Sequence, residues 1–224
     1  MSRTLSAPPT HGRDEYRFGR GERPVLQPGT IGWTAADLRD PEIRRLWDEG
    51  RYEIIEGVLT VMPAARFRGG NVGQNLVFLL RDYYAGRNIQ CKFAAEVDIE
   101  VAPPRVVRGD AAMVLPDDLP KFEALKFDEA GTDWRDHPLT LPPTLVIESL
   151  SPGHELHDRR TKRGWYAAFG VRHYWLVNAY DRSLECLVLE GSDYRSDAAG
   201  RDDDVLHPPA FPGLAIPLHD VWNA

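Results

Sequence analysis

Thr144-Leu-Val-Ile-Glu-Ser-Leu-Ser-Pro152 is an apolar run that ends in a carboxylate and a Ser-Pro step. The run is short, carries β-branched residues and stops at a proline, which predicts a buried β-strand over Leu145–Ser149. A carboxylate at the end of a buried strand is costly to desolvate unless it is paired or binds a metal ion. Glu148 is therefore a candidate catalytic residue.

The segment after this run predicts a helix and a second buried strand. Residues 155–169 have a helical pattern, and Gly170 is suited to end the helix. The next segment, His173–Asn178, reads as another strand. Strand, helix and strand in this order form a crossover unit, so we expect the two strands to be parallel neighbours. The fold class is therefore α/β, with a mixed central β-sheet flanked by helices.

The remaining elements follow from hydrophobic period and turn signals along the chain. We expect helices over 35–39, 41–47 and 71–84, a hairpin over 52–62, and strands over 93–101, 105–115 and 184–189. Residues 116–143 predict a surface excursion with a short element near 121–127. From residue 191 the chain is polar and predicts no further strand.

Composition sets the broad class of the protein. The 224 residues, 42% of them hydrophobic, predict one domain over residues 30–224 after a flexible tail over residues 1–29, which is rich in Pro, Gly and Arg. No apolar run has the length of a membrane span and no secretory signal is present, so a cytoplasmic protein without membrane contact is expected. Cys91 and Cys186 show neither metal nor redox spacing, which indicates buried thiols.

The net charge of −7 argues against a non-specific nucleic-acid binder, which usually has a basic surplus. A local basic patch remains within residues 155–172.

Lys162 is the most informative residue of the predicted helix. Asp158, Lys162, Trp165 and Phe169 are three or four residues apart, so they share one face, which we expect to pack on the sheet. The simplest interpretation is an Asp158–Lys162 pair that only supports the helix. The alternative is a metal-assisted hydrolase: two carboxylates would hold Mg²⁺, and the ammonium would stabilise charge in the transition state. Asp110, inside an apolar strand, would be the second carboxylate.

Other kinds of site have weaker support. His154 and His157 invite a zinc interpretation, but the H-E-x-x-H pattern is absent, and surface histidines at a helix start are the simpler reading. The serines of the run lack the G-x-S-x-G motif of a nucleophile elbow. Gly69-Gly70 precedes a helix without the G-K-[ST] of a phosphate-binding loop.

Four segments together resemble the Uma-two family, which belongs to the PD-(D/E)XK nuclease superfamily. They are Glu148-Ser-Leu-Ser-Pro152, then Asp158-x-x-x-Lys162-x-x-x-Tyr166, then Gly170-Val-Arg-His-Tyr-Trp-Leu-Val-Asn178, and the early Tyr52-Glu-Ile-Ile-Glu-Gly57. The resemblance runs from about residue 33 to residue 218. It implies a restriction-endonuclease-like α/β core.

The resemblance also implies a divalent-metal site with Asp110 and Glu148 as ligands. Leu150 occupies the usual lysine position two residues after the glutamate, and Lys162 on the helix takes the role of that lysine. Glu53 is similar to an additional acidic residue often counted in the site. The chain departs from the family pattern at Gly109, Ser149, His173, Asn178 and the segment over residues 66–70.

The sequence thus predicts a Mg²⁺-dependent endonuclease that hydrolyses phosphodiester bonds in DNA, with Mn²⁺ as a substitute ion. Arg159, Arg160 and Arg163 are candidate contacts to substrate phosphates. The sequence leaves the oligomeric state open, and a homodimer is one alternative, by analogy with other nucleases of this fold. The alternatives are a non-catalytic nucleic-acid-binding or regulatory protein on a nuclease scaffold, and a hydrolase of another phosphodiester.

Overall fold

The computed structural model describes residues 26–62, 67–125, 134–153 and 155–223, with the backbone alone for residues 67–71. Most of the predicted tail, residues 1–25, lies outside the described residues. By its internal contacts the chain divides into two compact units, Met1–Ala64 with Ala102–Val107, and Ala65–Val101 with Arg108–Ala224. The prediction of one domain over residues 30–224 stays a prediction.

The first unit contains two short helices and a β-hairpin. Its elements are η2 (Ala35–Arg39), α1 (Pro41–Glu49), β1 (Tyr52–Ile55) and β2 (Val58–Val61), and the start of β4 (Arg105–Val114) pairs with β1. The hairpin turns at Glu56 and Gly57, which both have positive φ angles, of 51° and 75°. A turn with two such residues matches the twist of its strands, and the predicted hairpin is confirmed.

The core of the first unit reaches into the end of the predicted tail. Leu26 is buried among tryptophan and aliphatic side chains, and the Gly29 amide donates to the Leu59 carbonyl at 2.8 Å. Residues 26–29 therefore belong to the packed unit. Thr34 caps η2 in a capping box with Asp37, whose Oδ2 atom accepts from the Thr34 amide at 2.8 Å.

The second unit is built on a mixed sheet. The strands β4, β5 (Leu145–Ser149), β6 (His173–Asn178), β7 (Ser183–Glu190) and β8 (Asp193–Arg201) lie in this order, and β3 (Lys92–Ala102) pairs with β4. Strands β5 and β6 are parallel, with Glu148 opposite Leu176, and the other neighbours in this order are antiparallel. The predicted strands, their parallel pairing and the mixed sheet are confirmed.

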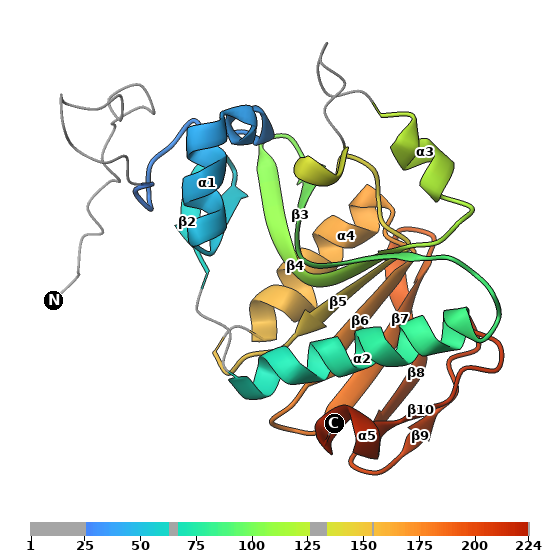
Figure 1. Cartoon of the computed structure of the whole chain (residues 1–224). Coiled ribbons are helices and arrows are strands. Elements are labelled where there is room, and N and C mark those ends of the chain that lie inside the picture. The colour runs from blue at the N-terminus through green and yellow to red at the C-terminus, as the bar shows by residue number, and fades with distance from the viewer. Residues whose placement is uncertain (1–25, 63–66, 126–133, 154, 224) are drawn as a thin grey trace, which may run out of the picture. The chain divides into compact units, whose positions relative to one another are not determined.

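Helices cover both faces of this sheet (Figure 1). One face carries Leu145 and Ile147 of β5 and packs on α2 (Phe67–Ala85) and α5 (Leu218–Asn223). Because side chains alternate along a strand, Glu148 points to the opposite face. That face is covered by the helical segment between β5 and β6.

This helical segment differs from the predicted α-helix. It begins as a wide π-helical turn, η4 (His157–Lys162), and continues as α4 (Arg163–Phe169). Gly170 ends it in the left-handed conformation, as predicted, with a φ of 96°. Trp165 and Phe169 are only half-buried. Their packing on the sheet stays a prediction, and the extra residue in the wide turn shifts the helix phase from that of a regular α-helix.

The buried side chains of α4 are Tyr166 and Ala167, and the Tyr166 hydroxyl reaches Glu148 of β5.

Several C-terminal elements were not predicted. β8, β9 (Val205–Leu206), β10 (Ile216–Pro217) and α5 follow residue 191, and β9 pairs with β10. Most side chains of β8 are exposed, and the strand is held by backbone pairing with β7. Its sequence therefore lacks the alternation of apolar and polar residues that would have predicted a strand. The excursion between β4 and β5 carries α3 (Leu119–Glu123) and η3 (Trp134–Asp136), and residues 126–133 lie outside the described part.

Two further observations concern the whole described chain. None of the described helices is both long and apolar enough to span a bilayer. Both cysteines are free thiols, Cys186 buried and Cys91 half-buried. Burial raises the pKa of the Cys91 thiol to about 11.

Candidate active site

Glu148 lies in the interior of the second unit, on the sheet face that η4 and α4 cover. Its side chain is almost fully buried. The Oε1 atom accepts a hydrogen bond from the Tyr166 hydroxyl at 2.8 Å and one from the Lys162 ammonium at 3.1 Å. Burial raises the pKa of Glu148 well above its usual value, Asp110 and Asp158 raise it further, and Lys162 and Tyr166 oppose the rise.

Lys162 is fully buried, with a relative exposure of 0%. Its Nζ atom lies 3.1 Å from Glu148 Oε1, 3.1 Å from the Arg108 carbonyl oxygen and 3.8 Å from Asp158 Oδ1. The ammonium donates hydrogen bonds to Glu148 and to the Arg108 carbonyl, and Asp158 is an ion-pair partner at a longer distance. The Asp158–Lys162 pair exists, but Lys162 also reaches the sheet, so it does more than support the helix.

A buried ion pair lies beside the acceptor of Lys162. The Arg108 guanidinium binds Asp98 across β3 and β4, with an Nε–Oδ1 distance of 2.8 Å, and both side chains are buried. This pair was not predicted, because charged residues in a strand pattern are normally read as its solvated face.

Asp110 meets Glu148 across two antiparallel strands. Ala111 of β4 lies opposite Ile147 of β5, so the next position along the ladder places Asp110 beside Glu148. Asp110 is half-exposed, and its Oδ2 atom accepts the Ser149 backbone amide at 2.7 Å. A Cβ at the preceding Gly109 would lie 3.3 Å from Val146 Cγ1 and in ordinary contact with the Tyr166 hydroxyl at 3.5 Å, so the strand is closely packed here.

Three carboxylates gather at this point. Asp110 and Asp158 interact electrostatically with Glu148, and the Lys162 ammonium lies 3.1 Å from Glu148 and 3.8 Å from Asp158. A hard divalent cation would offset the excess negative charge. Within the described residues no three His, Cys, Asp or Glu side chains form a complete metal cage. Mg²⁺ is usually held by one or two carboxylates plus waters and substrate phosphates, so Asp110 and Glu148 fit this ion.

Glu53 belongs to the first unit. It is fully buried on β1, opposite Thr60 of the hairpin. Its role as an accessory acid stays a prediction. His154 lies outside the described residues, and the His157 ring packs edge-on against Trp165 with centroids 5.6 Å apart.

The three predicted phosphate contacts differ in their surroundings. Arg159 forms an ion pair with Glu185 of β7, and Arg163 binds Asp193 at 3.0 Å and the Tyr194 carbonyl at 2.6 Å. These contacts connect η4 to β7 through Arg159 and α4 to β8 through Arg163. Arg160 is exposed and has no ion-pair partner within the part of the chain that the structure describes.

Two tyrosines complete the site and were given no role from the sequence. Tyr166 donates to Glu148, and Tyr174 of β6 donates to the Asp158 carbonyl at 3.2 Å. Their rings pack at a centroid distance of 5.2 Å. The spacing of Tyr166, four residues after Lys162, was a usable signal for the same helix face.

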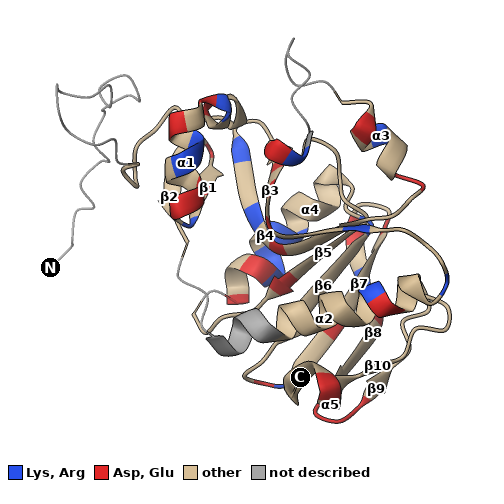
Figure 2. Cartoon of the chain, in the orientation of Figure 1, with Lys and Arg blue, Asp and Glu red and all other residues tan. Residues whose placement is uncertain are grey.

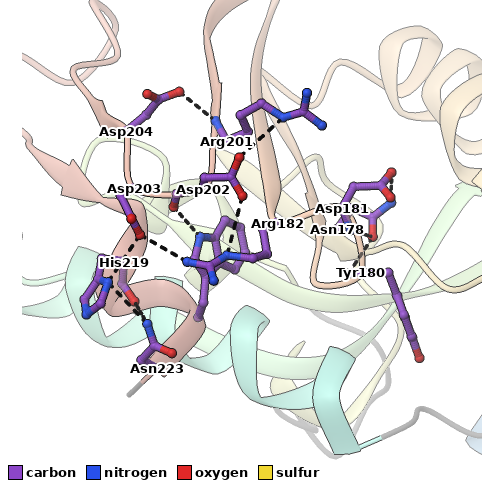
Figure 3. A network of polar contacts seen from close by, with 11 residues as sticks. Asn178, Tyr180, Asp181, Arg182, Arg201, Asp202, Asp203, Asp204, His219 and Asn223 are labelled. Carbon is purple, nitrogen blue, oxygen red and sulfur yellow. Dashed lines mark hydrogen bonds and ion pairs between the residues drawn. The ribbon is translucent and has the colours of Figure 1, made fainter.

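A second polar cluster lies at the other end of β7 and β8, where the acid surplus of the sequence gathers. Figure 3 shows Asp202 and Asp203 paired with Arg182, Asp204 bonded to the Arg201 amide, and Asp203 near His219. The side chains of these ion pairs are largely exposed. The cluster ties together the β6–β7 turn, the β8–β9 turn and α5, and it carries no feature of a reactive site.

Charged residues are distributed differently on two of the labelled helices. Figure 2 shows acidic and basic residues mixed on α1, where Arg44 pairs with Asp48 and Arg45 with Glu49, whereas α5 shows acid alone.

Comparison with known proteins agrees with this architecture. Among solved structures, the crystal structure of a putative nuclease belonging to DUF820 from Anabaena variabilis is similar, with a TM-score of 0.59 and 15% sequence identity. The match covers 78% of this chain and 90% of that chain, and at this identity it shows the fold. No curated protein matches the chain. The family model Uma2, described as a putative restriction endonuclease, matches residues 40–219. The chain therefore belongs to the Uma2 family, as its motifs predict.

Proposed function

We propose that this protein is a Mg²⁺-dependent endonuclease that hydrolyses phosphodiester bonds in DNA. The observation that carries the proposal is the buried contact between Lys162 and Glu148, beside a second carboxylate on the neighbouring strand. Burying a lysine ammonium costs desolvation free energy. A catalytic task for the charge gives a reason for this cost. The family and the fold of its structural neighbour support nuclease chemistry.

Each residue has a separate task in this proposal. Asp110 and Glu148 would hold the ion, which when bound polarises a phosphoryl oxygen and lowers the pKa of a water ligand. The Ser149 amide orients Asp110, and the Tyr166 hydroxyl orients Glu148. Both hydrogen bonds described for Glu148 fall on Oε1, which leaves Oε2 for the cation.

In this proposal Lys162 supplies a positive charge at a position that is shielded from solvent. Because its ammonium is fully buried, its electrostatic effect on a phosphate at the site is stronger than that of an exposed lysine. Preorganised charge of this kind stabilises the negative charge that develops on the phosphate oxygens.

The test is cleavage of supercoiled plasmid with Mg²⁺ or Mn²⁺ by the wild type, Asp110→Asn and Glu148→Gln. Calorimetry with Mn²⁺ follows the same three proteins, and Asp220→Asn on α5 is a control for a general loss of charge. We expect Mn²⁺ binding and cleavage in the wild type and the control, and loss of both in the two site variants. Cleavage that survives in Asp110→Asn would contradict the assignment.

A hydrolase of another phosphodiester is the second candidate. It is favoured by the pairing of Arg159 and Arg163 with acids, which leaves fewer free cations for a long DNA backbone. Cleavage of bis(p-nitrophenyl) phosphate without cleavage of plasmid or single-stranded DNA would support this candidate. Binding of DNA without any hydrolysis would instead support a non-catalytic role.

A further inference from the structure

The buried tyrosine of β6 contacts the irregular part of the helix that carries Lys162. Tyr174 is fully buried, and its hydroxyl donates to the Asp158 carbonyl at 3.2 Å. Asp158 lies in the π-helical turn η4, four residues before Lys162. The contact therefore joins the sheet to the turn from which the lysine projects.

A π-helical turn needs support from outside the helix. Such turns are rare, and they place one extra residue in the helix, which leaves the hydrogen bonding of the turn irregular. Here the Asp158 carbonyl accepts from the Arg163 amide, five residues on, and its second lone pair is filled by Tyr174. Without the hydroxyl, the segment loses a bond that favours the wide turn over an ordinary α-helical turn.

The wide turn ends at Lys162, which directly precedes α4. Removing the extra residue would rotate the residues before Lys162, Asp158 among them, by about 100° relative to α4, because an α-helix has 3.6 residues per turn. Asp158 Oδ1 lies 3.8 Å from Lys162 Nζ, and Glu148 Oε1 accepts from both Lys162 and Tyr166. The rotation would move Asp158 away from the ammonium that it helps to hold at Glu148.

We propose that Tyr174 is a positioning residue for Lys162: its hydroxyl stabilises the π-helical turn that brings the ammonium to Glu148. The inference rests on the proposed function for its catalytic meaning, but the position of Lys162 is measurable without any activity. Tyr174 itself touches neither of the proposed metal ligands through its hydroxyl, so its effect is indirect.

Tyr194 of β8 offers a matched control. It is also buried, it packs on Tyr174 with ring centroids 5.6 Å apart, and its hydroxyl donates to the Val171 carbonyl at 2.6 Å. Tyr174→Phe and Tyr194→Phe therefore each remove one oxygen and one buried hydrogen bond from the same aromatic stack. Only the first bond reaches the turn.

The experiment is reductive methylation of native protein, with the extent at each lysine read by mass spectrometry. The chain has four lysines, and exposed Lys92 and Lys121 serve as internal standards. We expect Lys162 to react slowly in the wild type and in Tyr194→Phe, and about tenfold faster in Tyr174→Phe, with the standards unchanged. Equal rates at Lys162 in the two variants would overturn the proposal.

Folding and kinetics complete the test. Both variants are checked by circular dichroism, and a Tyr174→Phe protein that fails to fold beside a folded Tyr194→Phe would also overturn the proposal, because it would make Tyr174 a residue of general stability. In cleavage assays we expect Tyr174→Phe to lower kcat about tenfold at unchanged KM and Mn²⁺ affinity. If the wild type cleaves no phosphodiester, the proposed function fails while the methylation result still decides the role of Tyr174.

Discussion

At the scale of single residues, Glu148 is a buried carboxylate that the proposed function requires in its ionised form. Its burial raises its pKa, and the Tyr166 hydroxyl works against that rise by donating to Oε1. Lys162 acts in the same direction as Tyr166. The ionised form of Glu148, which a metal ion requires, therefore depends on these two donors.

Tyr166→Phe is expected to move the pH dependence of metal binding. The lost hydrogen bond favoured the charged carboxylate, so the pKa of Glu148 rises and Mn²⁺ binding requires a higher pH. Calorimetry with Mn²⁺ at a series of pH values checks this, with Tyr194→Phe as the control. If Mn²⁺ binding is lost at the same acidic pH in Tyr166→Phe and in the wild type, the role of Tyr166 is refuted.

His173 gives a second pH-dependent prediction, for stability. It is buried against Phe211, and burial lowers its pKa from 6.5 to about 4. The unfolded chain takes up the proton below about pH 6.5 and the folded chain does not, so stability is fully present above pH 6.5 and is lost as the pH falls towards 4.

The loss from His173 amounts to at most about 3 kcal/mol, at about 1.36 kcal/mol for each pKa unit. Urea unfolding of the wild type and His173→Gln between pH 7.5 and 4.5 measures it, because contributions of other groups cancel in the difference. We expect the wild type to lose stability more steeply than the variant as the solution is acidified. Parallel curves would show that His173 does not titrate on unfolding.

At the scale of elements, helix α2 approaches the end of β5 closely. A Cβ at Gly73 would lie 2.9 Å from Ser149 Oγ, which is its nearest atom outside the surrounding turns of α2 among the described residues. Ser149 in turn donates its amide to Asp110, so the packing of α2 bears on the candidate site. Within the described residues the Ser149 hydroxyl has no hydrogen-bond partner.

Gly73→Ala should therefore have opposite effects in two backgrounds. In the wild type the new methyl group crowds Ser149, whereas in Ser149→Ala the crowding is absent and the gain in helix propensity remains. We expect the change in the free energy of unfolding to differ by about 1 kcal/mol between the backgrounds, as measured by urea denaturation. Equal changes would show that α2 has room to shift.

The elements also show what the sequence can and cannot predict. β5 and β6 were predicted residue for residue, because apolar runs bounded by proline and glycine have few other interpretations. The π-helical turn was not, since a period of 3.6 residues was assumed throughout the helix. That one extra residue explains why Tyr166 is buried where Trp165 was expected.

The same limit holds for the candidate site. Asp110, Glu148 and Lys162 were selected as charged residues within apolar patterns, and the structure brings them together. Arg108, Asp98 and Tyr174 were missed because their partners lie on other strands or in the wide turn. β8 was missed because a polar edge strand carries no period of its own.

At the scale of the whole molecule, a bound ion should stabilise the protein. Asp110, Glu148 and Asp158 lie close enough to interact electrostatically, so under the proposed function a divalent cation binds the folded chain more tightly than the unfolded chain. At a Mn²⁺ concentration of 100 times Kd, we expect the melting temperature to rise by about 5 to 10 °C. Differential scanning calorimetry checks the shift, and Asp110→Asn should abolish it. An equal shift in that variant would place the ion elsewhere.

The most direct measurement is the rate of plasmid cleavage by Lys162→Met under saturating Mn²⁺, beside the wild type and Lys121→Met. Methionine is one heavy atom shorter than lysine, fills most of the buried space and carries no charge, while Lys121 is an exposed lysine outside the site. We expect a loss of at least about 100-fold in Lys162→Met with little change in Lys121→Met. Equal rates in all three folded proteins would contradict the claim that Asp110, Glu148 and Lys162 form one hydrolytic site.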